Sequence, residues 1–240
     1  MESSWTSFGI REMSRMQELT FRPTIPDDPE SRVEDSTPCT LEVDPTVNYM
    51  VGGMMRTGTS MMMDIMRAVG FSVVFNPGRQ ATIDENSDEH YNPNPGGLYE
   101  LSAALMSRPK FPWMHRGKFV KTLGTLSTLY RNPEGGYKII YMRRDPYASA
   151  DSQLRFFGKP NQHPDLIANT VDLTLRHFDN RRDVQFLEVW YRKFIDHPWA
   201  HLRVIQAFLG VEFDVLKGLP VVDRDLCRSK REELPEGVWE

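Results

Sequence analysis

The segment Gly53-Met-Met-Arg-Thr-Gly58-Thr59-Ser60 has the residue types and the spacing of an anion-binding turn. Its pattern is that of a phosphate-binding loop, G-x-x-x-x-G-K-S/T. In such a loop the backbone N–H groups, together with those of the helix that follows, form a cradle for a negative group. Position 59 holds threonine in place of the loop's lysine, and the nearest cation is Arg56. In a nucleoside triphosphatase the lysine would neutralise the β- and γ-phosphates. This loop therefore suits an anionic ligand that does not need such a lysine.

A second candidate anion site follows about ninety residues later. The apolar run Tyr137-Lys-Ile-Ile-Tyr-Met142 leads into Arg143-Arg144-Asp145-Pro146, and Ser152 comes eight residues after Arg144. This order predicts Arg144 at the end of a strand and Ser152 about two turns into a helix, where the two could clamp one phosphate. The alternative is an arginine in a surface ion pair and a serine that faces solvent. We interpret Arg143 as a solvated neighbour.

These residues need strands and helices to position them, and the sequence predicts both in alternation. Short β-rich runs indicate strands at 47–51, 71–75, 118–123, 137–142 and 184–191. Helical composition with glycine or proline at the ends indicates helices at 60–69, 146–157, 165–180 and 199–209. The alternation predicts an α/β fold with a central, mainly parallel sheet that helices cover on both faces. Ligands bind such sheets at the carboxyl ends of the strands.

The first 46 residues differ from the rest in composition. The stretch 23–38 is rich in Pro, Asp, Glu and Ser, which is typical of an extended arm or linker. We therefore predict an extended or partly disordered N-terminal extension over 1–46 and an α/β domain over 47–240. The acidic arm could bind a partner or mediate oligomerisation, so a homo-oligomer stays open.

Composition and charge exclude several classes of function. The net charge is −4, whereas a nucleic-acid-binding protein usually has a basic excess, so we expect no nucleic acid partner. The two cysteines, Cys39 and Cys227, lack a partner at a metal-ligand spacing, so we expect no metal site. The chain shows neither a signal peptide nor an apolar run near the ~20 residues of a membrane span. We expect a soluble, cytoplasmic protein.

With these motifs in order, the chain resembles the P-loop sulfotransferase family, in its bacterial-type members. In this family one strand is followed by Arg/Lys-Ser/Thr-Gly-Thr-Ser/Thr. A later strand is followed by Arg-Asn/Asp-Pro, with a serine eight residues after that arginine. A third stretch, 186–210, resembles the family's late strand, adenine-side tyrosine and Phe-Leu-Gly helix end. The resemblance covers about 47–230 and implies a three-layer fold like that of P-loop NTPases. The implied cofactor is 3′-phosphoadenosine 5′-phosphosulfate, with adenosine 3′,5′-bisphosphate as product and no metal required.

The resemblance also implies a role for each matching residue. Five consecutive loop residues are expected to contact the 5′-phosphosulfate: Arg56, Thr57, Gly58, Thr59 and Ser60. Arg144 and Ser152 are expected to bind the 3′-phosphate. Tyr191 is expected to contact the adenine, and Arg228 to close over the 3′-phosphate.

The catalytic base is where the chain departs from the family pattern. Many cytosolic members carry Lys-Thr-His on the strand before the Arg-Asn/Asp-Pro strand, and this chain has Lys121-Thr122-Leu123. A histidine base at position 123 is therefore excluded. Other members use a glutamate, and the piece 94–100 resembles their motif, so we predict Glu100 as the general base or as a group that positions the acceptor. Lys121 and Arg56 complete the predicted catalytic set, with Lys121 neutralising the leaving phosphate.

The acceptor is unidentified, and alternatives to a sulfotransferase remain open from the sequence. Transfer to a hydroxyl or amine of a small-molecule or glycan acceptor is the expected reaction. A P-loop kinase or other nucleotide-binding protein is the first alternative, although Thr59 opposes it. The second alternative is a catalytically degenerate module that binds the phosphonucleotide and transfers nothing, and the missing histidine favours it.

Overall fold

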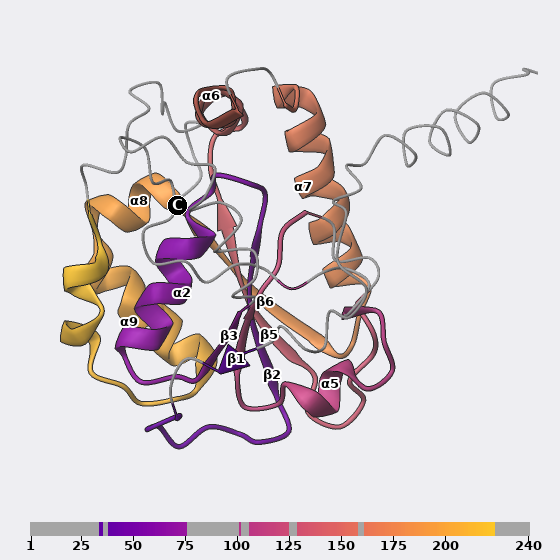
Figure 1. Ribbon diagram of the computed structural model, residues 1–240, viewed down its shortest axis with the longest axis vertical. Helices are drawn as coiled ribbons and strands as arrows, with labels where there is room; N and C mark the ends of the chain where they lie inside the picture. Colours follow the sequence, from indigo (N-terminus) through magenta and orange to yellow (C-terminus); the bar gives the residue numbers. More distant parts are fainter. Residues whose placement is uncertain are drawn as a thin grey trace, which may run out of the picture.

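The fold is built on one twisted sheet that is parallel except at one edge (Figure 1). The computed structural model describes residues 34–35, 38–75, 101, 106–124, 129–157 and 161–223. Its six strands run in the order β1 (Glu34–Asp35), β3 (Val73–Phe75), β4 (Phe119–Lys121), β2 (Asn48–Gly53), β5 (Tyr137–Arg143) and β6 (Val184–Trp190). From β3 through β4, β2 and β5 to β6, each strand pairs in parallel with the next. Strand β1 is antiparallel to β3.

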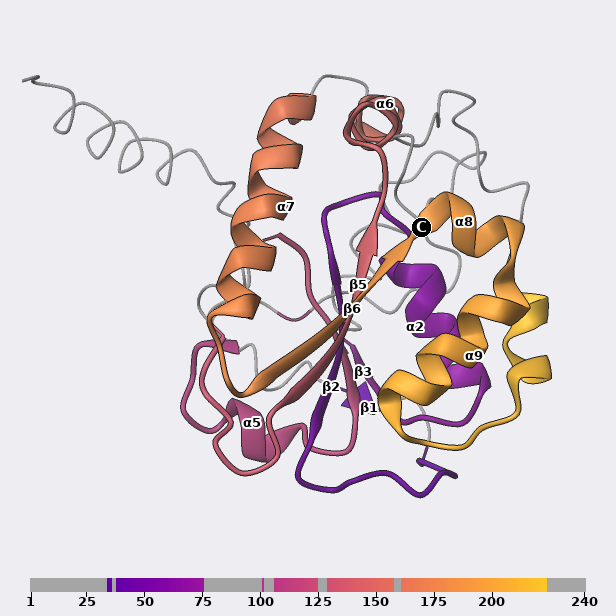
Figure 2. The same cartoon turned by 180° about the vertical axis from the view of Figure 1, so that it is seen from behind.

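Helices cover both faces of this sheet (Figures 1 and 2). On one face lie α2 (Thr59–Ala68), α8 (Tyr191–Asp196) and α9 (Pro198–Leu209), and on the other lies α7 (Pro164–Asp179). Helix α6 (Pro146–Phe157) follows directly on β5 beyond its carboxyl end, and the short α5 (Phe111–Met114) precedes β4. Two 3-10 turns, η3 (Val215–Lys217) and η4 (Leu219–Val221), end the described chain. The predicted α/β fold with a mainly parallel sheet flanked by helices is confirmed.

The core consists of two apolar layers, one on each face of the sheet. Met62, Met63 and Met66 of α2 are fully buried and pack with α8 and α9 against β2. The other layer packs Ile167 and Phe178 of α7 against the opposite face of β5. None of the helices in the described part of the chain is both long and apolar enough to span a membrane.

The predicted element boundaries agree with the structure to within a few residues, but several observed elements were not predicted. Among them are helix α8 and the turns η3 and η4. Residues 34–35 of the predicted extended arm form an edge strand, and the Thr40 N–H donates to the carbonyl of Gly70 at 2.9 Å. Residues 111–114 form an unpredicted helical turn. Tyr191 was predicted as the last residue of a strand, but it begins α8. The domain boundary at 46 stays a prediction.

A buried polar network joins the strands at the end of the sheet opposite to α6. Asn132 is completely buried, and its side-chain amide donates to the carbonyls of Thr46 and Gly136 and to Oδ1 of Asn48. Its backbone N–H donates to Oδ2 of Asp183 at 3.0 Å. Buried polar groups must be hydrogen-bonded to be tolerated, and here they hold the starts of β2, β5 and β6 together.

Asp183 gives this network a pH dependence. Burial alone would raise the pKa of its carboxyl, but the hydrogen bonds from Arg181 and from the Asn132 N–H outweigh burial and lower it. A lowered pKa in the folded state stabilises the protein above the ordinary carboxyl pKa, and this contribution is lost as the pH falls through the folded value.

We therefore expect Asp183→Asn to destabilise the fold by about 1–3 kcal/mol at pH 7, because it removes a charge-assisted pair. The difference from wild type should shrink below about pH 4, where the carboxyl of the unfolded wild-type chain begins to protonate, because the pKa in the folded state is lower. Urea denaturation at pH 7 and pH 3.5 measures both effects. Asp179→Asn, at an exposed position of α7, is the matched control. A difference that stays constant over this pH range would contradict the role given to the carboxylate.

Candidate anion-binding site

The loop between β2 and α2 has the backbone conformation of an anion cradle. Gly53, Arg56 and Gly58 have φ values of 153°, 68° and 91°. Arg56 is the one residue other than glycine with positive φ among the residues that the structure describes. Left-handed conformations cost energy for a residue with a side chain, and they concentrate at functional sites. Such residues turn successive N–H groups toward one side, which makes a concavity for an anion.

Within the loop, the side chains divide into buried and accessible ones. Thr57 is 2% exposed, and its hydroxyl donates to the carbonyl of Met54 at 2.8 Å, which closes the turn. Thr59 is also buried, whereas Arg56, Gly58 and Ser60 are half-buried. The side chains of Arg56 and Ser60 can therefore contact an anion. Thr57 and Thr59 can contact it through their backbone N–H groups.

The two anion motifs found in the sequence meet in the structure. Nε of Arg56 donates to Oγ of Ser152 at 3.1 Å, and Nη1 of Arg144 donates to the backbone carbonyl of Arg56 at 3.1 Å. The side-chain amide of Gln153 also reaches the carbonyl of Met55, at 3.4 Å. These contacts form because β2 and β5 are parallel neighbours, so the loop after β2 and the start of α6 lie at the same edge of the sheet.

Tyr191 supports the loop from inside the protein. It is 6% exposed and begins α8, directly after β6. The Arg144 guanidinium carbon lies 4.9 Å from the centre of its ring, and a Cβ added to Gly58 would lie 2.4 Å from its Cδ2. Tyr191 is therefore packed between the loop backbone and Arg144. The adenine contact expected from the sequence stays a prediction.

Lys121 brings a third cation to the site. It ends β4, which pairs with β2 so that Lys121 lies opposite Val51. The residue is 3% exposed, and its Nζ donates to Oγ of Ser60 at 2.7 Å. The lysine thus approaches the first turn of α2 from the neighbouring strand, although position 59 of the loop itself has none.

Not every residue predicted for the site falls within the described chain. Glu100 and Arg228 lie outside the described residues, so their predicted roles stay predictions. Arg143 pairs with Glu188 at 2.6 Å and stacks over the ring of Trp190. It therefore faces β6, whereas Arg144 faces the loop.

From the sequence, no role in the anion site was assigned to two of its neighbours, Asp64 and Phe156. The Phe156 ring lies 5.6 Å from the Arg56 guanidinium carbon, and Asp64 lies one turn after Ser60 on α2. Burial raises the pKa of Asp64, and the positive charges of Arg67 and Lys121 oppose this rise. Spacing alone contained a signal for both, since each lies four residues from a predicted site residue, Ser152 or Ser60.

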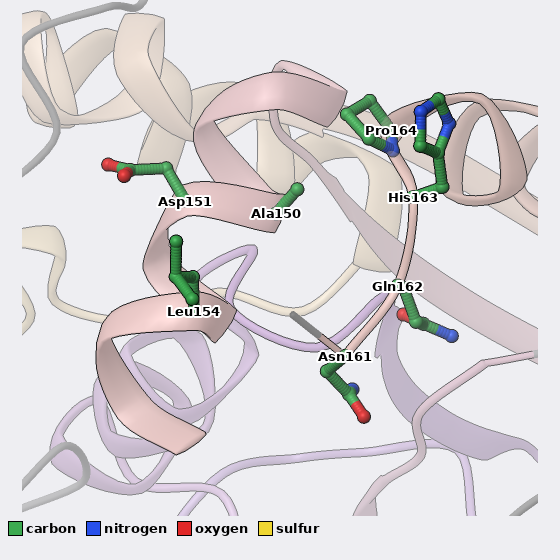
Figure 3. A pocket seen from close by; sticks show the side chains of 7 residues that line it. All are labelled: Ala150, Asp151, Leu154, Asn161, Gln162, His163 and Pro164. Carbon is green, nitrogen blue, oxygen red and sulfur yellow. The ribbon is translucent and has the colours of Figure 1, made fainter. Parts of the chain in front are cut away.

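A hollow of about 290 Å³ lies between α6 and residues 161–164 (Figure 3). Ala150 and Leu154 line it, each two residues from Ser152. Residues two apart in an α-helix point to nearly opposite sides. Ala150 and Leu154 therefore lie on the side of α6 opposite to Ser152, and we do not count the hollow as part of the anion-binding site.

No family model and no curated protein matches this sequence. Among solved structures, the mouse sulfotransferase SULT7A1 complexed with PAP is 14% identical, with a TM-score of 0.44 over 75% of this chain and 64% of that one. Retinol dehydratase in complex with androsterone and inactive cofactor PAP is 15% identical, with a TM-score of 0.42 and the same coverage. The sulfotransferase domain from the curacin biosynthetic pathway is 14% identical, with a TM-score of 0.44 over 76% of this chain and 80% of that domain.

This chain thus spans less than two thirds of the length of the first two of these proteins. All three TM-scores lie below 0.5. Any assignment of activity must therefore come from the site geometry of this chain.

The contact between Gly58 and Tyr191 predicts the effect of a single added methyl group. We expect Gly58→Ala to destabilise the fold by about 2 kcal/mol or more, because it adds both left-handed strain and a clash. Gly124→Ala is a matched control, since Gly124 has φ 77° and no atom within 4 Å of an added Cβ. That variant should lose only about 1 kcal/mol. Equal losses in urea denaturation would contradict the packing of Tyr191 against the loop.

Proposed function

We propose that the chain is a sulfotransferase that uses 3′-phosphoadenosine 5′-phosphosulfate as its donor. The observation that supports this most is the contact between the two anion motifs, Arg56 to Ser152 and Arg144 to the Arg56 carbonyl. The contact brings Arg56 and Arg144 close together at the edge of the sheet where α/β proteins bind ligands. A nucleotide with separate 5′ and 3′ anionic groups suits such a pair of sites.

The residues present fit this donor. The positive-φ turn at Arg56 and Gly58 shapes the loop as an anion cradle. Its backbone is packed so closely from behind that a Cβ at Gly58 would lie 2.4 Å from the ring of Tyr191. We assign the 5′-phosphosulfate to the loop residues Arg56, Thr57, Gly58, Thr59 and Ser60. We assign the 3′-phosphate to Arg144 and Ser152, which contact Arg56 of the loop. Tyr191 and Arg228 remain our proposals for the adenine and for closure over the 3′-phosphate.

The chemistry follows from where the charges lie. When bound, the donor supplies the sulfuryl group. Arg56 and Lys121 place positive charge beside the first turn of α2, where they can stabilise negative charge that develops on the leaving nucleotide. Because position 123 is leucine, we propose that Glu100 removes the proton of the acceptor, a hydroxyl or amine of a small molecule or glycan. We place this reaction in the cytoplasm and assign it no metal.

The kinase alternative lacks the lysine that would neutralise a γ-phosphate, since position 59 is a buried threonine. A degenerate binding module shares the donor site and differs only in the absence of transfer.

Donor binding can be tested by thermal stabilisation. We expect adenosine 3′,5′-bisphosphate to raise the melting temperature more than ATP with magnesium does, because only the former carries a 3′-phosphate. Arg144→Ala should weaken its binding more than about tenfold, the loss of one charge-assisted contact. Arg155→Ala, on the neighbouring helix α6 and paired with Asp151, is the control. A larger shift with ATP and magnesium would exclude the proposed donor.

The proposed base can be tested separately from the donor site. Glu100→Ala should bind adenosine 3′,5′-bisphosphate as wild type does but lose about 10²–10⁴-fold in sulfuryl transfer, the usual contribution of a general base. Arg56→Ala should lose both binding and transfer. Transfer is measured with labelled donor against a panel of hydroxyl and amine acceptors. Full turnover by Glu100→Ala would refute the assignment of the base.

If wild type binds the donor yet shows neither transfer nor donor hydrolysis, the binding module is the better description.

A further inference from the structure

Helix α6 carries a completely buried amide, that of Gln153, which the proposed mechanism does not use. The amide donates to the backbone carbonyl of Met55 at 3.4 Å and to Oε1 of Gln162 at 3.2 Å. Its own oxygen accepts from the side-chain amide of Asn161 at 3.0 Å. A glutamine amide has one N–H₂ group and one oxygen, so both ends of this amide are hydrogen-bonded. Gln153 therefore joins the loop after β2 to residues 161–162, which lie beside α6 (Figure 3).

The loop residue next to Met55 is the one with the unusual backbone. Arg56 has a φ of 68°. The carbonyl before it, of Met55, accepts from Gln153, and its own carbonyl accepts from Arg144 at 3.1 Å. A left-handed residue with a side chain is strained and persists only when its surroundings fix it. Here the peptide groups before and after Arg56 are both held, and neither can turn over without losing a hydrogen bond.

The direction of each carbonyl also sets the direction of the N–H group that follows it. The peptide bonds of the loop are trans, so the C=O and the N–H of one peptide group point in opposite directions. The hydrogen bond to the Met55 carbonyl therefore points the N–H of Arg56 away from Gln153. In the same way, the hydrogen bond from Arg144 points the N–H of Thr57 away from Arg144. Backbone N–H groups line the concavity that such a turn offers to an anion.

We infer that Gln153 is a positioning residue, which fixes the N–H of Arg56 in the anion cradle by holding the Met55 carbonyl. Its neighbour Ser152 contacts the Arg56 side chain, so two consecutive residues of α6 hold the side chain and the backbone of the loop. This positioning is independent of which anion binds. Its effect on nucleotide affinity rests on the proposed function.

A purely structural role would give a different result. If Gln153 only anchored residues 161–162 to α6, removing the Asn161 contact would affect anion binding as much as removing Gln153 does. Asn161→Ala removes that contact and leaves the donor to Met55 in place. Gln153→Met removes both contacts and nearly conserves the volume of the buried side chain. The two variants therefore separate anchoring from positioning.

The test combines calorimetry with nitrogen-15 relaxation of the ligand-free protein. We expect Gln153→Met to weaken the binding of adenosine 3′,5′-bisphosphate about fivefold, the loss of one hydrogen bond. The order parameters of the Arg56 and Thr57 N–H groups should fall from about 0.85 to below about 0.6. Asn161→Ala should keep the affinity within about twofold of wild type. Gln185→Met, at an exposed position of β6, is the matched control.

Asn161→Asp provides a second variant that should fold, because position 161 is exposed. A carboxylate only accepts hydrogen bonds, so it should draw the N–H₂ group of Gln153 toward itself and turn the Gln153 oxygen toward the Met55 carbonyl. The order parameter of the Arg56 N–H should therefore fall in Asn161→Asp but not in Asn161→Ala. If Gln153→Met does not fold, this comparison tests the inference in its place.

The inference is overturned if Gln153→Met leaves the Arg56 order parameter at its wild-type value, or if Asn161→Ala causes the same loss of affinity. Where Gln153→Met does not fold, an equally rigid loop in Asn161→Asp and Asn161→Ala overturns it. If wild type does not bind adenosine 3′,5′-bisphosphate, the proposed donor is wrong. The relaxation measurements need no ligand, so they still test the role of Gln153.

Discussion

The left-handed backbone at Arg56 and Gly58 is the constraint on which the rest of the site depends. Because Gly58 has no side chain, the ring of Tyr191 can pack directly against the loop, and Tyr191 in turn lies beneath Arg144. The turn at Arg56, with its φ of 68°, leaves its carbonyl where Arg144 can donate to it. One unusual stretch of backbone thus links the loop, β5 and α8. A side chain at position 58 would disturb all three contacts, although only one of them involves that residue directly.

The parallel sheet explains how a chain with a net charge of −4 can assemble a cationic site. The carboxyl ends of neighbouring parallel strands lie at one edge. Strand β2 leads into the Arg56 loop, β5 leads to Arg144, and β4 ends at Lys121. Each strand contributes one cation, and the helix dipole of α2 adds partial positive charge at its first turn. Attraction for an anion is therefore local and comes from topology, without any basic excess in the composition.

Much of this arrangement could be predicted from the sequence, because local residue types mark where helices and strands begin and end. Contacts between distant segments could not be predicted in this way. Apolar runs that end at glycine or proline mark where elements stop, so helix 146–157 was predicted with its observed bounds. The β-rich pattern of the preceding residues predicts a strand through Tyr191, whereas the chain begins a helix there and packs the Tyr191 ring against Gly58. The contact of Lys121 with Ser60 depends on the register of β4 against β2, which residue types do not encode.

The residues proposed for donor binding and those proposed for catalysis depend on different strands. The loop and Arg144 follow β2 and β5, whereas Lys121 and Leu123 belong to β4 and the residues just after it. The N–H groups of Thr122 and Gly124 donate to the carbonyls of Val51 and Gly53, so position 123 still lies beside the end of β2. Leu123 takes part in neither of the contacts that join the loop to Ser152 and Arg144. Donor geometry is therefore compatible with either an enzyme or a binding module, because a base supplied by another segment changes nothing in β2 or β5. Only proton removal from an acceptor distinguishes the two, which is why the identity of the base carries more weight for function than further detail of the phosphate contacts.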